Sequence, residues 1–303
     1  MTPEPPRNQA LWWVAAGAAL ISLAAPLVKG TSVEPTLAAI CRMWFGSLTL
    51  GLLLLINPEW RRGWRRGWGA SALIALFFAL DLWFWHRSIH WLSPGLATLL
   101  ANFQVFLLPL LGRVIYAEKP APRFFIGLLL AAGGLWLLFG HNWQQFTGLN
   151  RWGVVYGVLT AVAYAAYTLT LRHAQSGGQA PAASARLFQV SLLCTILLVI
   201  DGWIEGLDFF AIHGSDWLRL IALGVLCQVF GWILIARGLP GVAAAIAGLL
   251  LLLQPSLSLV WDFLFFGLQL STLQIIGVLL ALAGIYFGTR VRRPRPARTP
   301  STG

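Results

Sequence analysis

One acidic side chain lies in the middle of an apolar run, where a carboxylate could do chemistry. Asp81 is near the centre of the run 69–89. A carboxylate at the centre of a membrane helix costs about 2.5–3.5 kcal/mol on insertion scales. Residues three or four apart share a helix face, so Phe78, Asp81 and Trp85 form an aromatic stripe. Asp81 could bind a substrate ammonium group or relay a proton. As a structural group, it could instead pair with Arg42 or Lys29 on a neighbouring helix.

Uncharged amides are a second set of polar groups within apolar runs. Asn102 and Gln104 lie in the run 93–116, and Gln254 lies in the run 242–266. An amide can hydrogen-bond a zwitterion without bringing a full charge out of water. The structural alternative is hydrogen bonding between helices, worth about 0.6 kcal/mol for each bond. Both interpretations are open at this point.

Aromatic and amide side chains also mark two later runs. Tyr164 lies in the run 152–171, and Gln228 and Trp232 lie in the run 217–236. Aromatic faces with few polar groups suit an aromatic or amphipathic ligand, although such residues also serve packing. The three Cys and five His are scattered without paired spacing, so we expect no metal site, cofactor or catalytic residue.

Two further charged residues are expected to be structural. Arg42 lies early in the run 36–56 and could snorkel to the membrane interface or stabilise the bundle by pairing with an acid. Asp262 is close to the end of the run 242–266. We expect it to be interfacial or ion-paired.

Membrane-crossing helices must position these residues. Of the 303 residues, 58% are hydrophobic and only 10% are charged, whereas a soluble domain carries about 25% charged residues. Long apolar runs favour helices over a β-barrel, and a span needs roughly 20 apolar residues. The sequence therefore predicts an all-α integral membrane protein with ten transmembrane helices. The runs are 10–28, 36–56, 69–89, 93–116, 122–140, 152–171, 185–204, 217–236, 242–266 and 272–289.

The basic residues predict an orientation. With both chain ends in the cytoplasm, the outer side of the membrane holds only five of the 21 Lys and Arg residues. Those five are Lys29, Arg42, Arg87, Arg151 and Arg219. Because short cytoplasmic loops carry an excess of Lys and Arg, the pattern predicts an N-in, C-in protein.

Comparing the chain with itself reveals a repeat with an offset of 150 residues. The matches are Gln104 with Gln254, Gly127 with Gly277 and Gly134 with Gly284. They predict five-helix repeats at 1–140 and 152–289, a connecting loop at 141–151 and a disordered basic tail at 290–303. Five is odd, so the second repeat must be inverted. Inverted repeats are common in secondary transporters, where the substrate site lies near the midplane. Two inverted repeats around a shared site favour transport by alternating access, in which the site opens to one side of the membrane at a time.

Several motifs resemble the EamA-type transporters of the drug/metabolite transporter superfamily. In the first half they are the segments 75–80 and 116–120 with Gly127 and Gly134, and in the second half Gly231, Arg237, Gln254-Pro255, Gly277 and Gly284. The family's acidic residue before the fifth helix of each half is kept as Glu118 but replaced by Leu268. The family's proline early in the fourth helix is kept as Pro255 but replaced by Val105.

The resemblance implies a transporter rather than an enzyme, located in the bacterial inner membrane. It suggests export of small metabolites, most of all amino acids including aromatic ones. Glu118 would then have a structural or gating role. The alternatives are an efflux transporter for drugs or toxic cations and, less favoured, a membrane-embedded transferase. The expected partners are a small-molecule substrate and the lipid bilayer, with no nucleic acid, and the protein would be a monomer or a homodimer.

Overall fold

The computed structural model describes residues 6–116, 122–140, 148–175, 180–242 and 244–289. These residues form helices joined by short loops, and this part of the chain contains no β-strand. Each predicted apolar run corresponds to helical structure. Nine helices within the described ranges are long and apolar enough to cross a membrane, while Thr272–Gly288 is apolar but shorter. The count of ten spans and the N-in orientation therefore stay predictions.

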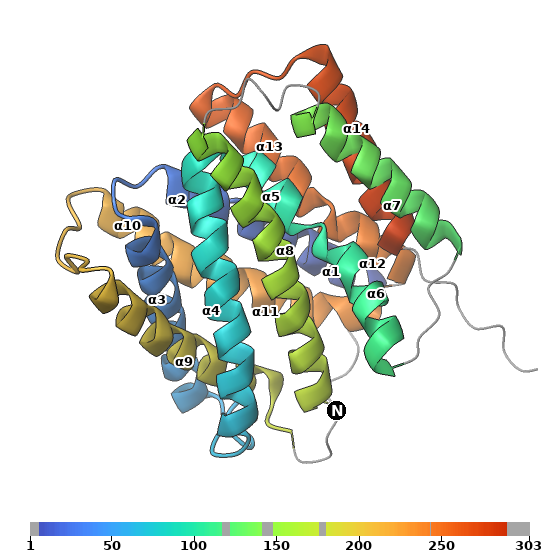
Figure 1. Ribbon diagram of the computed structural model, residues 1–303. Helices are drawn as coiled ribbons and strands as arrows, with labels where there is room; N and C mark the ends of the chain where they lie inside the picture. Colours follow the sequence, from blue (N-terminus) through green and yellow to red (C-terminus); the bar gives the residue numbers. More distant parts are fainter. Residues whose placement is uncertain (1–5, 117–121, 141–147, 176–179, 243, 290–303) are drawn as a thin grey trace, which may run out of the picture.

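The helices follow one another in the order shown in Figure 1. In the first half they are α1 (Arg7–Ser22), α2 (Ala24–Lys29), α3 (Pro35–Ile56), α4 (Trp68–Trp91), α5 (Pro94–Ala101), α6 (Gln104–Tyr116) and α7 (Pro122–Leu135), the last continued by a π-helical turn, Trp136–Gly140. In the second half they are α8 (Gly148–Gln175), α9 (Ala183–Ile204), α10 (Asp216–Ala222), a π-helical stretch (Leu223–Gly231), α11 (Trp232–Gly238), α12 (Ala244–Leu251), α13 (Leu253–Phe266) and α14 (Thr272–Thr289).

The loop predicted at 141–151 is partly helical, because α8 begins at Gly148. Residues 141–147 and the predicted tail 290–303 lie outside the described residues, as does Glu118. The two predicted repeats, 1–140 and 152–289, stay predictions.

Prolines break two of the spans. A proline inside a helix cannot donate a hydrogen bond to the carbonyl four residues earlier. Pro26 is four residues after Ser22, where α1 ends, and Pro255 is four residues after Leu251, where α12 ends. The span formed by α5 and α6 is also interrupted, at Asn102, whose amide donates to the carbonyl of Thr98 at 2.8 Å. The breaks between α5 and α6 and between α12 and α13 matter below, because Asn102 and Gln254, next to them, line the same cavity.

Close helix packing depends on small residues. The helices α7 and α14 lie side by side (Figure 1). A methyl group at Gly127 would lie 2.6 Å from the Gly284 carbonyl oxygen, and one at Gly134 would lie 2.5 Å from that of Gly277. These two helices therefore pack closely against each other within one chain, because glycine leaves room for the neighbouring backbone.

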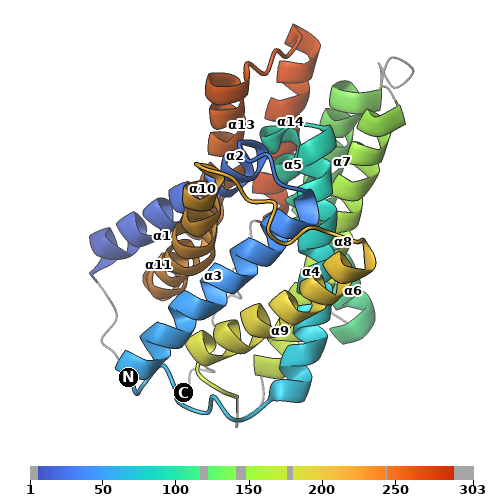
Figure 2. The same cartoon turned by 90° about the vertical axis from the view of Figure 1, so that its left-hand side faces the viewer.

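The bundle has two ends, which we name by their loops. At one end, the arginine loop (57–67) joins α3 to α4; at the other, the acidic loop (205–215) joins α9 to α10 (Figure 1). The helices α3 and α9 pack against each other between these ends, and α1 packs against α11 (Figure 2). The helices α4 and α8 are also in contact along the bundle.

Candidate substrate cavity

A cavity of about 550 Å³ lies inside the bundle. Its volume is within the range of about 300–1,000 Å³ that is usual for small-molecule sites. Both halves of the chain contribute to its walls, and most of the lining is apolar. The polar and aromatic lining residues are Arg42, Phe78, Asp81, Trp85, Thr98, Asn102, Gln104, Thr160, Tyr164, Trp232 and Gln254.

Most residues predicted to bind substrate line this cavity. They are Phe78, Asp81, Trp85, Asn102, Gln104, Tyr164, Trp232 and Gln254. Gln228 does not line it but is buried directly behind Arg42, to which it is hydrogen-bonded. Arg42 itself also lines the cavity, although we expected only a structural role. The structure thus brings these side chains together, while their role in binding stays a prediction.

Arg42 does not snorkel to the membrane interface. Its side chain is buried, with only 6% of its surface exposed. Its Nε donates to Oε1 of Gln228 at 2.9 Å, and its guanidinium carbon lies 5.3 Å from the centre of the Trp85 ring. These two partners hold the guanidinium in the cavity wall. Its two terminal nitrogens have no hydrogen-bond partner in the described part of the chain.

Asp81 lines the same cavity and is equally buried, at 6% exposure. Within the described ranges, its carboxylate forms neither a hydrogen bond nor an ion pair. It interacts electrostatically with Arg42, but the ion pair considered for these two residues is not formed. A buried carboxylate without a hydrogen bond or an ion pair is costly, because no direct contact replaces the water that it has lost. It is therefore suited to bind a cationic group of a ligand.

Aromatic rings form the wall next to Asp81. Phe78 stacks on Tyr167, with the ring centres 4.7 Å apart, and Tyr167 lies 5.5 Å from Tyr164. Two polar atoms of other cavity-lining residues are buried and have no partner among the described residues, namely Nε1 of Trp232 and Oε1 of Gln104. Buried polar groups are nearly always paired in native proteins. A donor and an acceptor without a protein partner therefore belong to residues of the cavity lining.

Two polar lining residues, Thr98 and Thr160, were missing from the predicted set. The hydroxyls of Thr98 and Thr160 each donate to the carbonyl four residues earlier, at 2.8 Å. Both threonines can therefore lie in an apolar helix, because their hydroxyls are hydrogen-bonded within that helix. Helical spacing could have indicated both, because Thr98 precedes Asn102 by four residues and Thr160 precedes Tyr164 by four.

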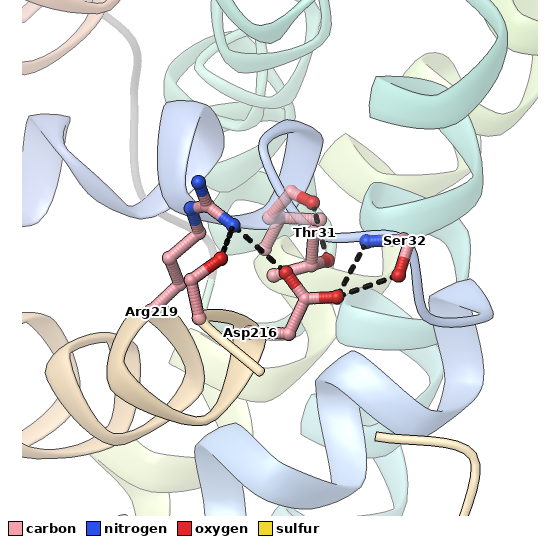
Figure 3. A network of polar contacts seen from close by, with 6 residues as sticks. Thr31, Ser32, Asp216 and Arg219 are labelled. Carbon is pink, nitrogen blue, oxygen red and sulfur yellow. Dashed lines mark hydrogen bonds and ion pairs between the residues drawn. The ribbon is translucent and has the colours of Figure 1, made fainter. Parts of the chain in front are cut away.

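The acidic-loop end is held together by polar contacts between the halves of the chain. In Figure 3, Oδ2 of Asp216 accepts from the backbone N–H of Ser32 at 3.0 Å and from its hydroxyl at 2.6 Å. Arg219 donates to the other carboxylate oxygen at 2.8 Å. At the same end, Arg87 pairs with Glu205.

Asp262, which we expected to be interfacial or ion-paired, also lies at this end. It is fully buried, and its Oδ2 accepts from the backbone N–H of Gly95 at 3.0 Å. This bond joins α13 to the first turn of α5. The arginine-loop end also carries contacts between the halves of the chain, such as the hydrogen bond from the Ser184 hydroxyl to the Trp60 carbonyl at 3.0 Å. The cavity lining extends toward this end through Leu239 and Val242.

Long apolar helices around a cavity with a few polar groups are typical of a multi-pass membrane protein. The sequence matches the EamA-like transporter family over residues 8–140 and 151–290. The chain therefore belongs to this family, whose members are membrane transporters.

Individual relatives agree with this assignment. The chain is similar to "Uncharacterized transporter YwfM" of Bacillus subtilis, with 27% identity over 177 residues, which is 56% of each chain. It is also similar to "Uncharacterized transporter YxxF" of the same organism, with 24% identity over 85% of this chain and 81% of the relative. A protein of known crystal structure shares the fold, with a TM-score of 0.63 and 19% identity over 94% of this chain and 98% of the other.

Proposed function

We propose that this protein exports amino acids, including aromatic ones, across the bacterial inner membrane by alternating access. The observation that carries the proposal is the arrangement of Arg42 and Asp81. Both line one cavity, both are buried, and they form no ion pair with each other. Opposite charges held apart in a common cavity match the two charged groups of a zwitterion.

The proposed binding mode assigns each part of an amino acid to a wall of the cavity. Asp81 binds the ammonium group of the substrate. The two terminal nitrogens of the Arg42 guanidinium bind the carboxylate through two parallel hydrogen bonds. The side chain of the substrate rests against Phe78, Trp85 and Trp232. Gln228 has a positioning role, because its hydrogen bond fixes the direction of the Arg42 guanidinium. The ligand would supply the partners that these buried charges lack.

Alternating access is supported by the packing of the helices. If α1 corresponds to α8 and α4 to α11, then the contact of α1 with α11 is the counterpart of the contact of α4 with α8, and both are present. The helices α5 and α13 are in contact near the acidic-loop end. The inner segments α6 and α12, on the other side of the two helix breaks, border the cavity. Pivoting at these breaks would close one end and open the other.

The alternative, efflux of organic cations, is favoured by the same carboxylate and aromatic wall, since a cation binds well next to aromatic faces. The two functions differ in whether the ligand must carry a carboxylate. Phenylalanine and phenethylamine share the ring and the ammonium group, and only phenylalanine has the carboxylate. A comparison of these two compounds therefore separates the functions.

The test uses the purified protein in liposomes loaded with unlabelled phenylalanine. We expect saturable counterflow of labelled phenylalanine and much weaker uptake of labelled phenethylamine. Equal or faster movement of the amine would favour cation efflux. Uptake of neither compound by folded protein would contradict both proposals, and chemical conversion of the substrate in detergent would indicate an enzyme.

A further inference from the structure

A second hollow lies on the side of the bundle, away from the substrate cavity. This side groove, of about 410 Å³, lies between α3 and the start of α9 and reaches the arginine loop. Apart from Ser47 and Arg61, its lining residues are hydrophobic or glycine. The Ser47 hydroxyl donates to the carbonyl of Trp44 at 2.9 Å, within its own helix. Arg61 is therefore the one charged group in the groove lining among the described residues.

The groove is open to the surroundings of the bundle. Leu48 and Leu55 line it with 50% and 71% of their surfaces exposed. Gly51 contributes to its depth, because a methyl group there would already be 3.3 Å from the Phe188 ring. In a membrane, such a surface faces acyl chains, which fit an apolar groove better than water does.

The arginine loop places positive charge at the mouth of this groove. It carries four arginines against one glutamate. All four are exposed: Arg61, Arg62, Arg65 and Arg66. In the part of the chain that is described, the Arg61 guanidinium has no hydrogen bond or ion pair. The guanidinium of Arg65 lies 5.5 Å from the centre of the Trp64 ring, which itself forms part of the groove wall.

The loop is held in place by α9. Buried Gln189 donates from Nε2 to the carbonyls of Trp64 at 2.6 Å and Arg66 at 2.9 Å. Arg186 donates to the carbonyl of Gly67 at 2.8 Å. Gly63 and Gly67 adopt φ values of +72° and +73°, which other residues rarely adopt. The position of the loop arginines relative to the groove is thus set before any ligand binds.

We propose that the side groove is a binding site for an anionic phospholipid. An apolar groove beside a fixed cation fits an amphiphile that has one hydrocarbon chain and one negative headgroup. The hydrocarbon chain of the lipid lies along α3 against Trp44 and Leu52, and its phosphate is next to Arg61. Basic pockets between membrane helices are known to recognise anionic headgroups. This inference is independent of the transported substrate.

Native mass spectrometry of the full-length protein tests the proposal. The protein is equilibrated in detergent with equal amounts of phosphatidylglycerol and phosphatidylcholine that have identical acyl chains. We expect bound phosphatidylglycerol to exceed phosphatidylcholine. Arg61→Gln should lower this preference about fivefold, the effect of one arginine near an anionic headgroup. Arg62→Gln is the matched control, because it removes the same charge from the same loop but does not line the groove.

A second variant tests the groove itself. Gly51→Leu should occupy the hollow and reduce the amount of bound phosphatidylglycerol, and a thermal unfolding curve checks that the variant is folded. Equal binding of the two lipids by the wild-type protein would overturn the proposal. Equal effects of Arg61→Gln and Arg62→Gln would also overturn it, because general charge attraction would then suffice. The proposal would also be overturned if folded Gly51→Leu bound as much phosphatidylglycerol as the wild-type protein.

Discussion

Replacing Asp81 with asparagine removes the negative charge and keeps the shape of the side chain. A hydrogen bond to a charged group contributes about 1.5–3 kcal/mol. Losing this contact with the substrate ammonium should lower kcat/KM for phenylalanine by roughly 10- to 150-fold. Because Asp81 has no hydrogen-bond or ion-pair partner among the residues described, the substitution breaks no direct contact and removes only the electrostatic attraction to Arg42. The thermal unfolding midpoint should therefore change little.

Counterflow of labelled phenylalanine into liposomes measures the effect, with unfolding followed on the same preparations. Asp208→Asn is the control, since Asp208 is an exposed acid of the acidic loop and lies outside the cavity. It should transport like the wild-type protein. If Asp81→Asn transported phenylalanine normally across the pH range, the proposed site would be wrong. A loss of transport with an equal loss of folded protein would show that Asp81 is structural.

Three other substitutions follow from the structure. Arg42→Lys removes the planar fork, so KM for phenylalanine should rise roughly tenfold while uptake of phenethylamine is unchanged; equal effects on both would refute a carboxylate contact. Gly134→Ala should lower stability by about 1–3 kcal/mol in thermal unfolding, whereas Gly133→Ala, with open space around it, should not, and similar curves would contradict the close packing of α7 and α14. Ser32→Ala removes a hydroxyl hydrogen bond shown in Figure 3, so a cysteine placed at Thr98 should be labelled roughly fivefold faster from the acidic-loop end; unchanged labelling would show that this contact does not hold that end closed.

The sequence predicts the helical elements well because the physics that forms them is local. In lipid, every backbone N–H and C=O group needs a hydrogen-bond partner. A long apolar run therefore forms a helix, which pairs these groups within the run itself. The same holds for the face of a single helix. Phe78, Asp81 and Trp85 were placed on one stripe by spacing alone, and all three line the cavity.

Interactions between distant segments could not be predicted in the same way. Arg42 faces inward because Gln228 and Trp85, on other helices, hold it there. Nothing near Arg42 in the chain distinguishes this arrangement from snorkelling. Asp262 is buried because the first turn of α5 presents a backbone N–H to it. Thr98 was overlooked because a threonine that bonds to its own helix gives no signal of polarity in an apolar run.

The central claim is that the cavity binds both charged ends of one amino acid. Binding of labelled phenylalanine to the detergent-solubilised protein, competed by phenethylamine and by 3-phenylpropionate, tests it most directly, because each competitor lacks one of the two charges. We predict that unlabelled phenylalanine competes at least about tenfold better than either compound, since each loses one charged contact. Competition by either compound as strong as that by phenylalanine would contradict the claim.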